Sequence, residues 1–120
     1  MSNQNVTLEY LGRELVKIDS SDLSGAISFP SLEQLRERAM TFIKEQWPTI
    51  LDSSCSAWEN ADKQKRKEAI ETAVKSVTDK LPPPYNIISV AAPIVTYLID
   101  QNITYLCQHR PQDPPAITAS

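Results

Sequence analysis

Glycine and phenylalanine are scarce in this chain, whose 120 residues include two of each. A β-sandwich or β-barrel needs many tight turns, and glycine supplies them because it adopts backbone angles that other residues avoid. The sequence therefore predicts a mainly α fold. It also lacks a glycine-rich phosphate loop, a nucleophile elbow, a paired-cysteine metal motif and a histidine-centred catalytic set. We expect a noncatalytic protein with no catalytic residue, no cofactor and no metal.

Cysteine is equally scarce, and Cys55 and Cys107 lie far apart in the sequence. The polar N-terminus, residues 1–5, lacks the basic and then apolar arrangement of a secretory signal. We therefore expect a cytoplasmic protein whose two cysteines are thiols. A structural zinc site normally takes four ligands, and on a helix Cys107 and His109 would point to nearly opposite sides.

Charge is distributed unevenly, although the net charge of −3 is mild. Residues 61–80 carry ten charged side chains, whereas residues 81–99 carry none. The first run predicts a solvated amphipathic helix, with opposite charges four residues apart on its wet face. The second predicts a buried central helix over residues 86–108. Its uncharged core, residues 87–99, is too short to span a bilayer, so no membrane association is expected.

Proline and short polar residues mark the expected helix ends. Ser31 is the predicted N-cap of a helix that reaches Trp47, and Pro48 begins a short helix to about residue 54. Ser56 has the capping-box pattern, so the charged helix should start near residue 57 and end before the prolines at 82–84. We expect a single domain over residues 1–110 and a flexible proline-rich tail over residues 111–120.

The segment from Val6 to Ile18 fits two structures. Its leucines recur at helical spacing, but Val6, Leu8 and Tyr10 alternate as in a strand. A glycine within a helix costs about 1 kcal/mol, whereas Gly12 would suit a two-residue hairpin turn. The hairpin is favoured over the helix. The complete prediction is a bundle of three to four helices with an N-terminal β-hairpin.

Four residues are the predicted protein interface: Trp47, Leu51, Trp58 and Asp100. The two tryptophans are eleven residues apart, which on one continuous helix would place both rings and Leu51 on one side, and tryptophan is enriched at binding hot spots. Asp100 belongs to a polar group next to the apolar run and needs a partner if it is buried. We expect a protein–protein interaction module, an adaptor or small subunit that binds another protein or its own copy.

The alternative function is nucleic-acid binding through a basic cluster: Lys63, Lys65, Arg66 and Lys67. Such a cluster can bind phosphates by counterion release. Acidic residues flank it and no aromatic side chains lie between the basic ones for base stacking, so this is the weaker hypothesis. An enzyme that acts through Asp100 with Tyr97, Tyr105 or His109 ranks third, and no small-molecule substrate is inferred.

Overall fold

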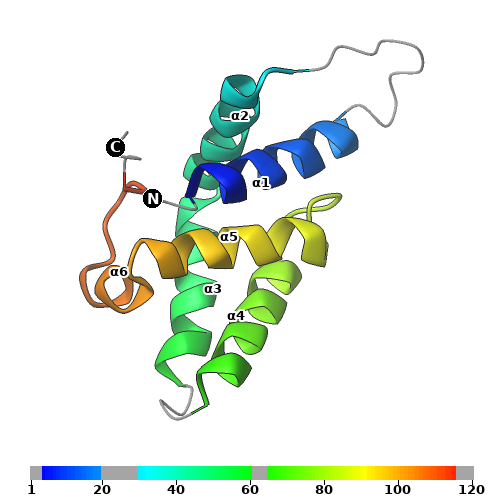
Figure 1. Cartoon of the computed structure of the whole chain (residues 1–120). Helices are drawn as coiled ribbons and strands as arrows, with labels where there is room; N and C mark the ends of the chain where they lie inside the picture. The colour runs from blue at the N-terminus through cyan, green and yellow to red at the C-terminus, as the bar shows by residue number, and fades with distance from the viewer. Residues whose placement is uncertain (1–3, 20–29, 61–64, 116–120) are drawn as a thin grey trace.

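The computed structural model describes residues 4–19, 30–60 and 65–115, and these ranges form six α-helices without a β-strand (Figure 1). The helices are α1 (Gln4–Asp19), α2 (Leu32–Glu45), α3 (Trp47–Glu59), α4 (Arg66–Lys80), α5 (Ile88–Asp100) and α6 (Ile103–His109). The mainly α prediction is confirmed. The prediction of three to four helices is wrong because the expected helix over residues 86–108 is interrupted and the N-terminal segment is helical.

The predicted N-terminal hairpin is wrong, since residues 4–19 form the continuous helix α1. Leu8, Leu11 and Leu15 occupy one face of it and are fully buried. Gly12 lies against α2, where an added Cβ would come within 2.8 Å of Leu35 Cα and would overlap the Leu35 carbonyl group. Glycine is therefore needed for the close approach of two helices, and this tertiary requirement outweighs its unfavourable helix propensity.

Helices α2 and α3 follow each other with a break at Gln46. Ser31 is the N-cap of α2, as predicted, and forms a reciprocal capping box with Gln34. Pro48 lies in the first turn of α3, also as predicted, because its missing N–H is tolerated there. The predicted boundary at Ser56 is wrong. That residue lies inside α3, and the charged helix α4 begins later, at Arg66.

Helix α4 has the predicted wet and dry faces. Ala69, Ala73 and Val77 are buried, whereas Glu71 and Lys75 on the charged ladder are exposed. Each such pair stabilises a helix by only a few tenths of a kcal/mol, about 0.2–0.5. The burial of the apolar seam is therefore what holds α4 in the fold.

Helix α5 is the central element: α1 packs on one side of it and α4 on the other, and α3 crosses behind it in the view of Figure 1. The predicted single helix over 86–108 is wrong, since it is broken after Asp100. Asn102 has a left-handed backbone, φ 68°, and its side chain accepts a hydrogen bond from the Tyr105 amide to start α6. The first turn of α5 is also less buried than expected, because Ile88 is 67% exposed.

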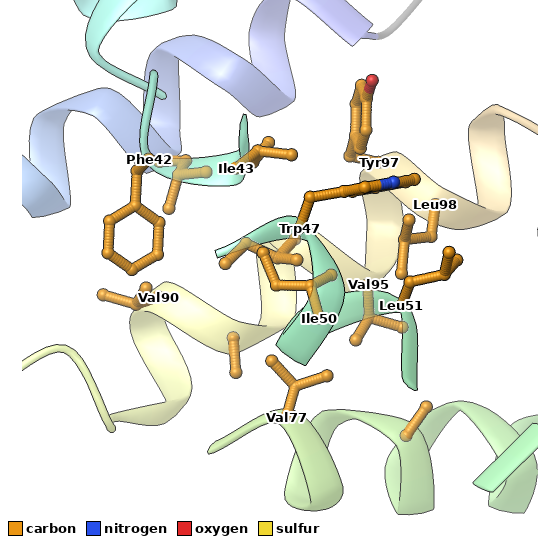
Figure 2. Close-up of a cluster of buried hydrophobic side chains, with 14 of the residues drawn as sticks. Phe42, Ile43, Trp47, Ile50, Leu51, Val77, Val90, Val95, Tyr97 and Leu98 are labelled. Atoms are coloured by element: carbon orange, nitrogen blue, oxygen red, sulfur yellow. The ribbon is translucent and has the colours of Figure 1, made fainter. Parts of the chain in front are cut away.

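The core gathers around α5 and the start of α3. Figure 2 shows Trp47 and Ile50 of α3 beside Tyr97 and Leu98 of α5. Trp47 is 1% exposed and Tyr97 is fully buried. Among the described residues, no helix is both long enough and apolar enough to cross a membrane.

Candidate protein-binding surface

The four predicted interface residues lie in two different environments. Trp47 and Leu51 are core residues, since 1% and 6% of their surface is exposed. Trp58 is half-buried near the end of α3, and Asp100 is exposed at the end of α5. Trp58 and Asp100 thus have surface to offer a partner, whereas Trp47 and Leu51 would contact one only if something that covers them moved. The interface itself stays a prediction.

The short helix α6 lies beside Trp58. The Trp58 indole Nε1–H donates a hydrogen bond to Thr104 Oγ1 over 3.2 Å. A helix of seven residues is marginal alone, because nucleation is costly and few hydrogen bonds follow it. Its position must therefore come from contacts with the rest of the molecule.

A disulfide between Cys55 and Cys107 joins α3 to α6. The prediction that both cysteines are thiols is wrong. The expected compartment predicts thiols, but the pairing depends on which helices face each other, and the sequence does not show that. The two residues are 52 positions apart in sequence, yet their Cα atoms are 5.3 Å apart, a normal separation for a bridged pair. Disulfides are uncommon in the cytosol, so the cytoplasmic prediction gains no support from this pair.

Arg110 adds an electrostatic link at the end of α6. Its guanidinium lies 3.3 Å from Asp52 and 3.1 Å from Glu59, both on α3. All three side chains are at least 44% exposed, and exposed ion pairs contribute little energy each. Arg110 also has a left-handed backbone, φ 41°, which ends α6 and turns the chain toward α3.

Glu59 also completes the one group of possible metal ligands in the described part of the chain, together with Cys55 and Cys107. The ligand atoms lie within 4.8 Å of one another. Metal ions bind the thiolate form of cysteine. Because both sulfurs are used in the disulfide, the group does not fit a metal in this structure.

The outer side of α6 presents aromatic side chains to solvent. Tyr105 is 53% exposed, and its ring centroid lies 4.1 Å from that of the exposed His109. With the half-buried Trp58 and the exposed Thr104, these residues form what we call the α6 surface. Its aromatic groups combine large apolar area with polar tips, as is typical of protein-binding hot spots.

The residues of the third hypothesis differ in their exposure to solvent. Tyr97 is buried, and its hydroxyl donates a hydrogen bond to the carbonyl oxygen of Pro115 over 2.9 Å. Burial raises the pKa of Tyr97 to about 12, so it stays a hydrogen-bond donor at neutral pH. Asp100 and Tyr105 are exposed. Catalysis through Asp100 stays an untested hypothesis.

The basic cluster lies at the start of α4. Lys65, Arg66 and Lys67 are exposed, and Lys63 lies outside the described residues. Lys65 lines a groove of about 380 Å³ between α3 and α4, and Glu68 lines the same groove. A phosphate group placed there would meet a carboxylate as well as an ammonium group. Nucleic-acid binding by this cluster stays a prediction.

A polar contact joins α1, α2 and the segment before α5. Asp19 at the end of α1 accepts hydrogen bonds from Arg38 Nε, 2.9 Å, and from the Tyr85 hydroxyl, 2.8 Å. Burial raises the pKa of Asp19, but these two hydrogen bonds outweigh it and hold the pKa below its usual value. The hydrogen bond from the Tyr85 hydroxyl to Asp19 also raises the pKa of Tyr85. This group stabilises the junction of α1, α2 and the segment before α5.

The disulfide, the contacts of Arg110 and the contacts of residues 111–115 do not follow from the sequence pattern. The disulfide, the Arg110 ion pairs and the Trp47–Pro111 hydrogen bond join residues more than fifty positions apart. The Tyr97–Pro115 hydrogen bond joins residues 18 positions apart, and the sequence contains no local signal for any of these contacts. The prolines at 111, 114 and 115 predict a flexible tail, and their spacing gives no sign of these contacts. Comparison of the chain with known protein families, curated proteins and solved structures finds no significant match.

Proposed function

We propose that this protein is a noncatalytic interaction module that binds another protein through the α6 surface. The observation that carries the proposal is the exposure of Tyr105 and His109 beside Trp58 on a short helix that a disulfide fastens to α3. Aromatic residues with few rotatable bonds lose little conformational entropy on binding. A surface that is already held in place costs less to order when a partner arrives.

The experiment compares two tyrosines of similar exposure on different helices. Tyr105 is 53% exposed on α6, and Tyr10 is 49% exposed on α1. The chain and its Tyr105→Ala and Tyr10→Ala variants are used to capture binding proteins, which are identified by mass spectrometry and then titrated in purified form. The proposal predicts that Tyr105→Ala weakens binding at least tenfold, as at a typical hot spot, and that Tyr10→Ala leaves it unchanged.

Self-association is tested in the same series. Size-exclusion chromatography with light scattering measures the mass of the chain and of the Tyr105→Ala variant over a range of concentrations. A dimer that Tyr105→Ala dissociates would make the partner a second copy of the chain. A monomer that captures no protein, or binding that depends on Tyr10 alone, would refute the proposal.

A further inference from the structure

The C-terminal proline-rich segment, residues 111–115, lies against the helical body in a specific pattern. Its prolines, Pro111, Pro114 and Pro115, are half-buried, whereas Gln112 and Asp113 between them are exposed. The prolines therefore face the body and the polar residues face solvent. This is how a segment with a P-x-x-P spacing would be held if its prolines were what the body recognises.

Two buried aromatic residues bind the backbone of this segment. The Trp47 indole Nε1–H donates to the Pro111 carbonyl oxygen over 2.8 Å, and the Tyr97 hydroxyl donates to the Pro115 carbonyl oxygen over 2.9 Å. In Figure 2 the Tyr97 hydroxyl points away from the other labelled side chains of the core. Each donor needs an acceptor because an unpaired buried donor is costly, about 1–3 kcal/mol.

Proline-rich segments suit such a site chemically. Proline has no backbone N–H, so the carbonyl groups of a proline-rich segment are free to accept hydrogen bonds. Its restricted backbone also loses little entropy on docking. Domains that recognise P-x-x-P segments use grooves lined with aromatic residues, and here Trp47 and Tyr97 supply both aromatic surface and donors.

We propose that Trp47 and Tyr97 form a binding site for proline-rich peptide segments of a partner protein, which residues 111–115 occupy within the chain. This Trp47–Tyr97 site is separate from the α6 surface and does not rest on the function proposed above. A tethered segment competes at an effective concentration of about millimolar. The chain's own segment therefore inhibits binding, and a partner gains access when that segment is displaced.

The test uses the full-length chain and a peptide with the sequence of residues 110–115, with a second peptide in which all prolines are alanine as control. Binding is followed by NMR through the indole Nε1–H signal of Trp47, which is distinguished from that of Trp58 with a Trp58→Phe variant. A Pro114→Ala/Pro115→Ala variant weakens the internal segment. We expect it to bind the proline peptide at least tenfold more tightly than the natural chain does, and neither chain to bind the alanine peptide.

A second substitution tests the hydrogen bond itself in the Pro114→Ala/Pro115→Ala background, where internal competition is small. Tyr97→Phe keeps the ring and removes the hydroxyl, so peptide affinity should fall about 3- to 10-fold, the value of one hydrogen bond. Tyr105→Phe is the matched control and should have no effect. Circular dichroism checks that all variants keep their helix content.

Three outcomes would overturn the proposal. The first is an unchanged Trp47 indole signal at millimolar peptide in the Pro114→Ala/Pro115→Ala variant. The second is equal binding of the proline and alanine peptides. The third is a concentration-dependent dimer, seen by light scattering, in which residues 111–115 are exchanged and added peptide does not compete, because the occupant is then a second copy and not a partner protein.

Discussion

Removal of the Cys55–Cys107 disulfide should destabilise the protein by an amount that depends on the length of the loop it closes. The bridge closes a loop of 52 residues between α3 and α6. In the chain-entropy model, the stabilisation grows with the logarithm of loop length, and a loop of this size gives about 4 kcal/mol at 25 °C. Most small domains have a total unfolding free energy of about 5–15 kcal/mol. The disulfide is therefore a large part of the stability.

The perturbation is a Cys55→Ala/Cys107→Ala variant, because alanine leaves no buried hydroxyl at either position. Urea unfolding, followed by circular dichroism, measures the free energy of unfolding with and without a dithiol reductant. With an m value of about 1–3 kcal/mol per molar urea, the midpoint of the natural chain should fall by about 1–4 M on reduction. The variant should have the same urea midpoint as the reduced natural chain, and the reductant should not change that midpoint.

The reasoning fails on either of two results. Equal midpoints for the oxidised and reduced natural chain would mean that the bridge does not restrain the unfolded state. A variant as stable as the oxidised chain would mean that α6 is held by its buried residues, Ile103 and Leu106, without help from the disulfide. Mass spectrometry of the alkylated protein confirms the oxidation state in each sample.

Three smaller perturbations test other parts of the fold by the same unfolding assay. Gly12→Ala should destabilise the protein by at least about 1 kcal/mol, because the added methyl group collides with the α2 backbone and the cost of overpacking exceeds the gain in helix propensity. A variant more stable than the natural chain would contradict the close approach of α1 to α2. Ser54→Ala should stabilise the protein by about 1 kcal/mol, since Ser54 Oγ is buried without a hydrogen-bond partner in the described structure. Ser53→Ala is the control and should not stabilise the protein, because it removes the hydrogen bond from Ser53 Oγ to the Thr49 carbonyl oxygen. Asp19 has a lowered pKa in the folded protein, so its contribution to stability is complete above its ordinary pKa of 3.8 and is lost as the pH falls below that value toward the folded pKa. Asp19→Asn should remove that part of the pH dependence of the unfolding free energy. The same dependence on pH in the variant and the natural chain would refute the role given to Asp19.

Local signals in the sequence predicted the local features of the fold. The Ser31 cap, the break before Pro48 and the wet face of α4 depend on residues within one or two turns, which the sequence displays directly. The central position of α5 also follows, because an uncharged run must be covered. The same local approach failed at Gly12, whose cost in a helix is local but whose benefit comes from α2.

The candidate sites were harder to predict because they depend on long-range contacts. Trp58 and Asp100 were found from residue type, and they are accessible to a partner. Trp47 was also found, but its environment depends on Pro111, 64 residues later. The break at Asn102, which starts α6, requires a left-handed backbone conformation. Asparagine tolerates that conformation, but an asparagine in the sequence does not by itself indicate it.

The two proposed sites are linked through the geometry at the end of α6. Cys107 is fixed to α3, and the left-handed Arg110 three residues later turns the chain back along α3, where Asp52 and Glu59 hold its side chain. The direction of the chain after α6 therefore already brings Pro111 close to Trp47, and the hydrogen bonds from Trp47 and Tyr97 hold the segment there. Because the attachment of α6 and the position of residue 111 share these restraints, loss of the disulfide should loosen the internal segment as well as the α6 surface. Reduction would then favour a proline-rich partner at the Trp47–Tyr97 site while it weakens a partner at the α6 surface, so that opposite responses to one reductant distinguish binding at the two sites.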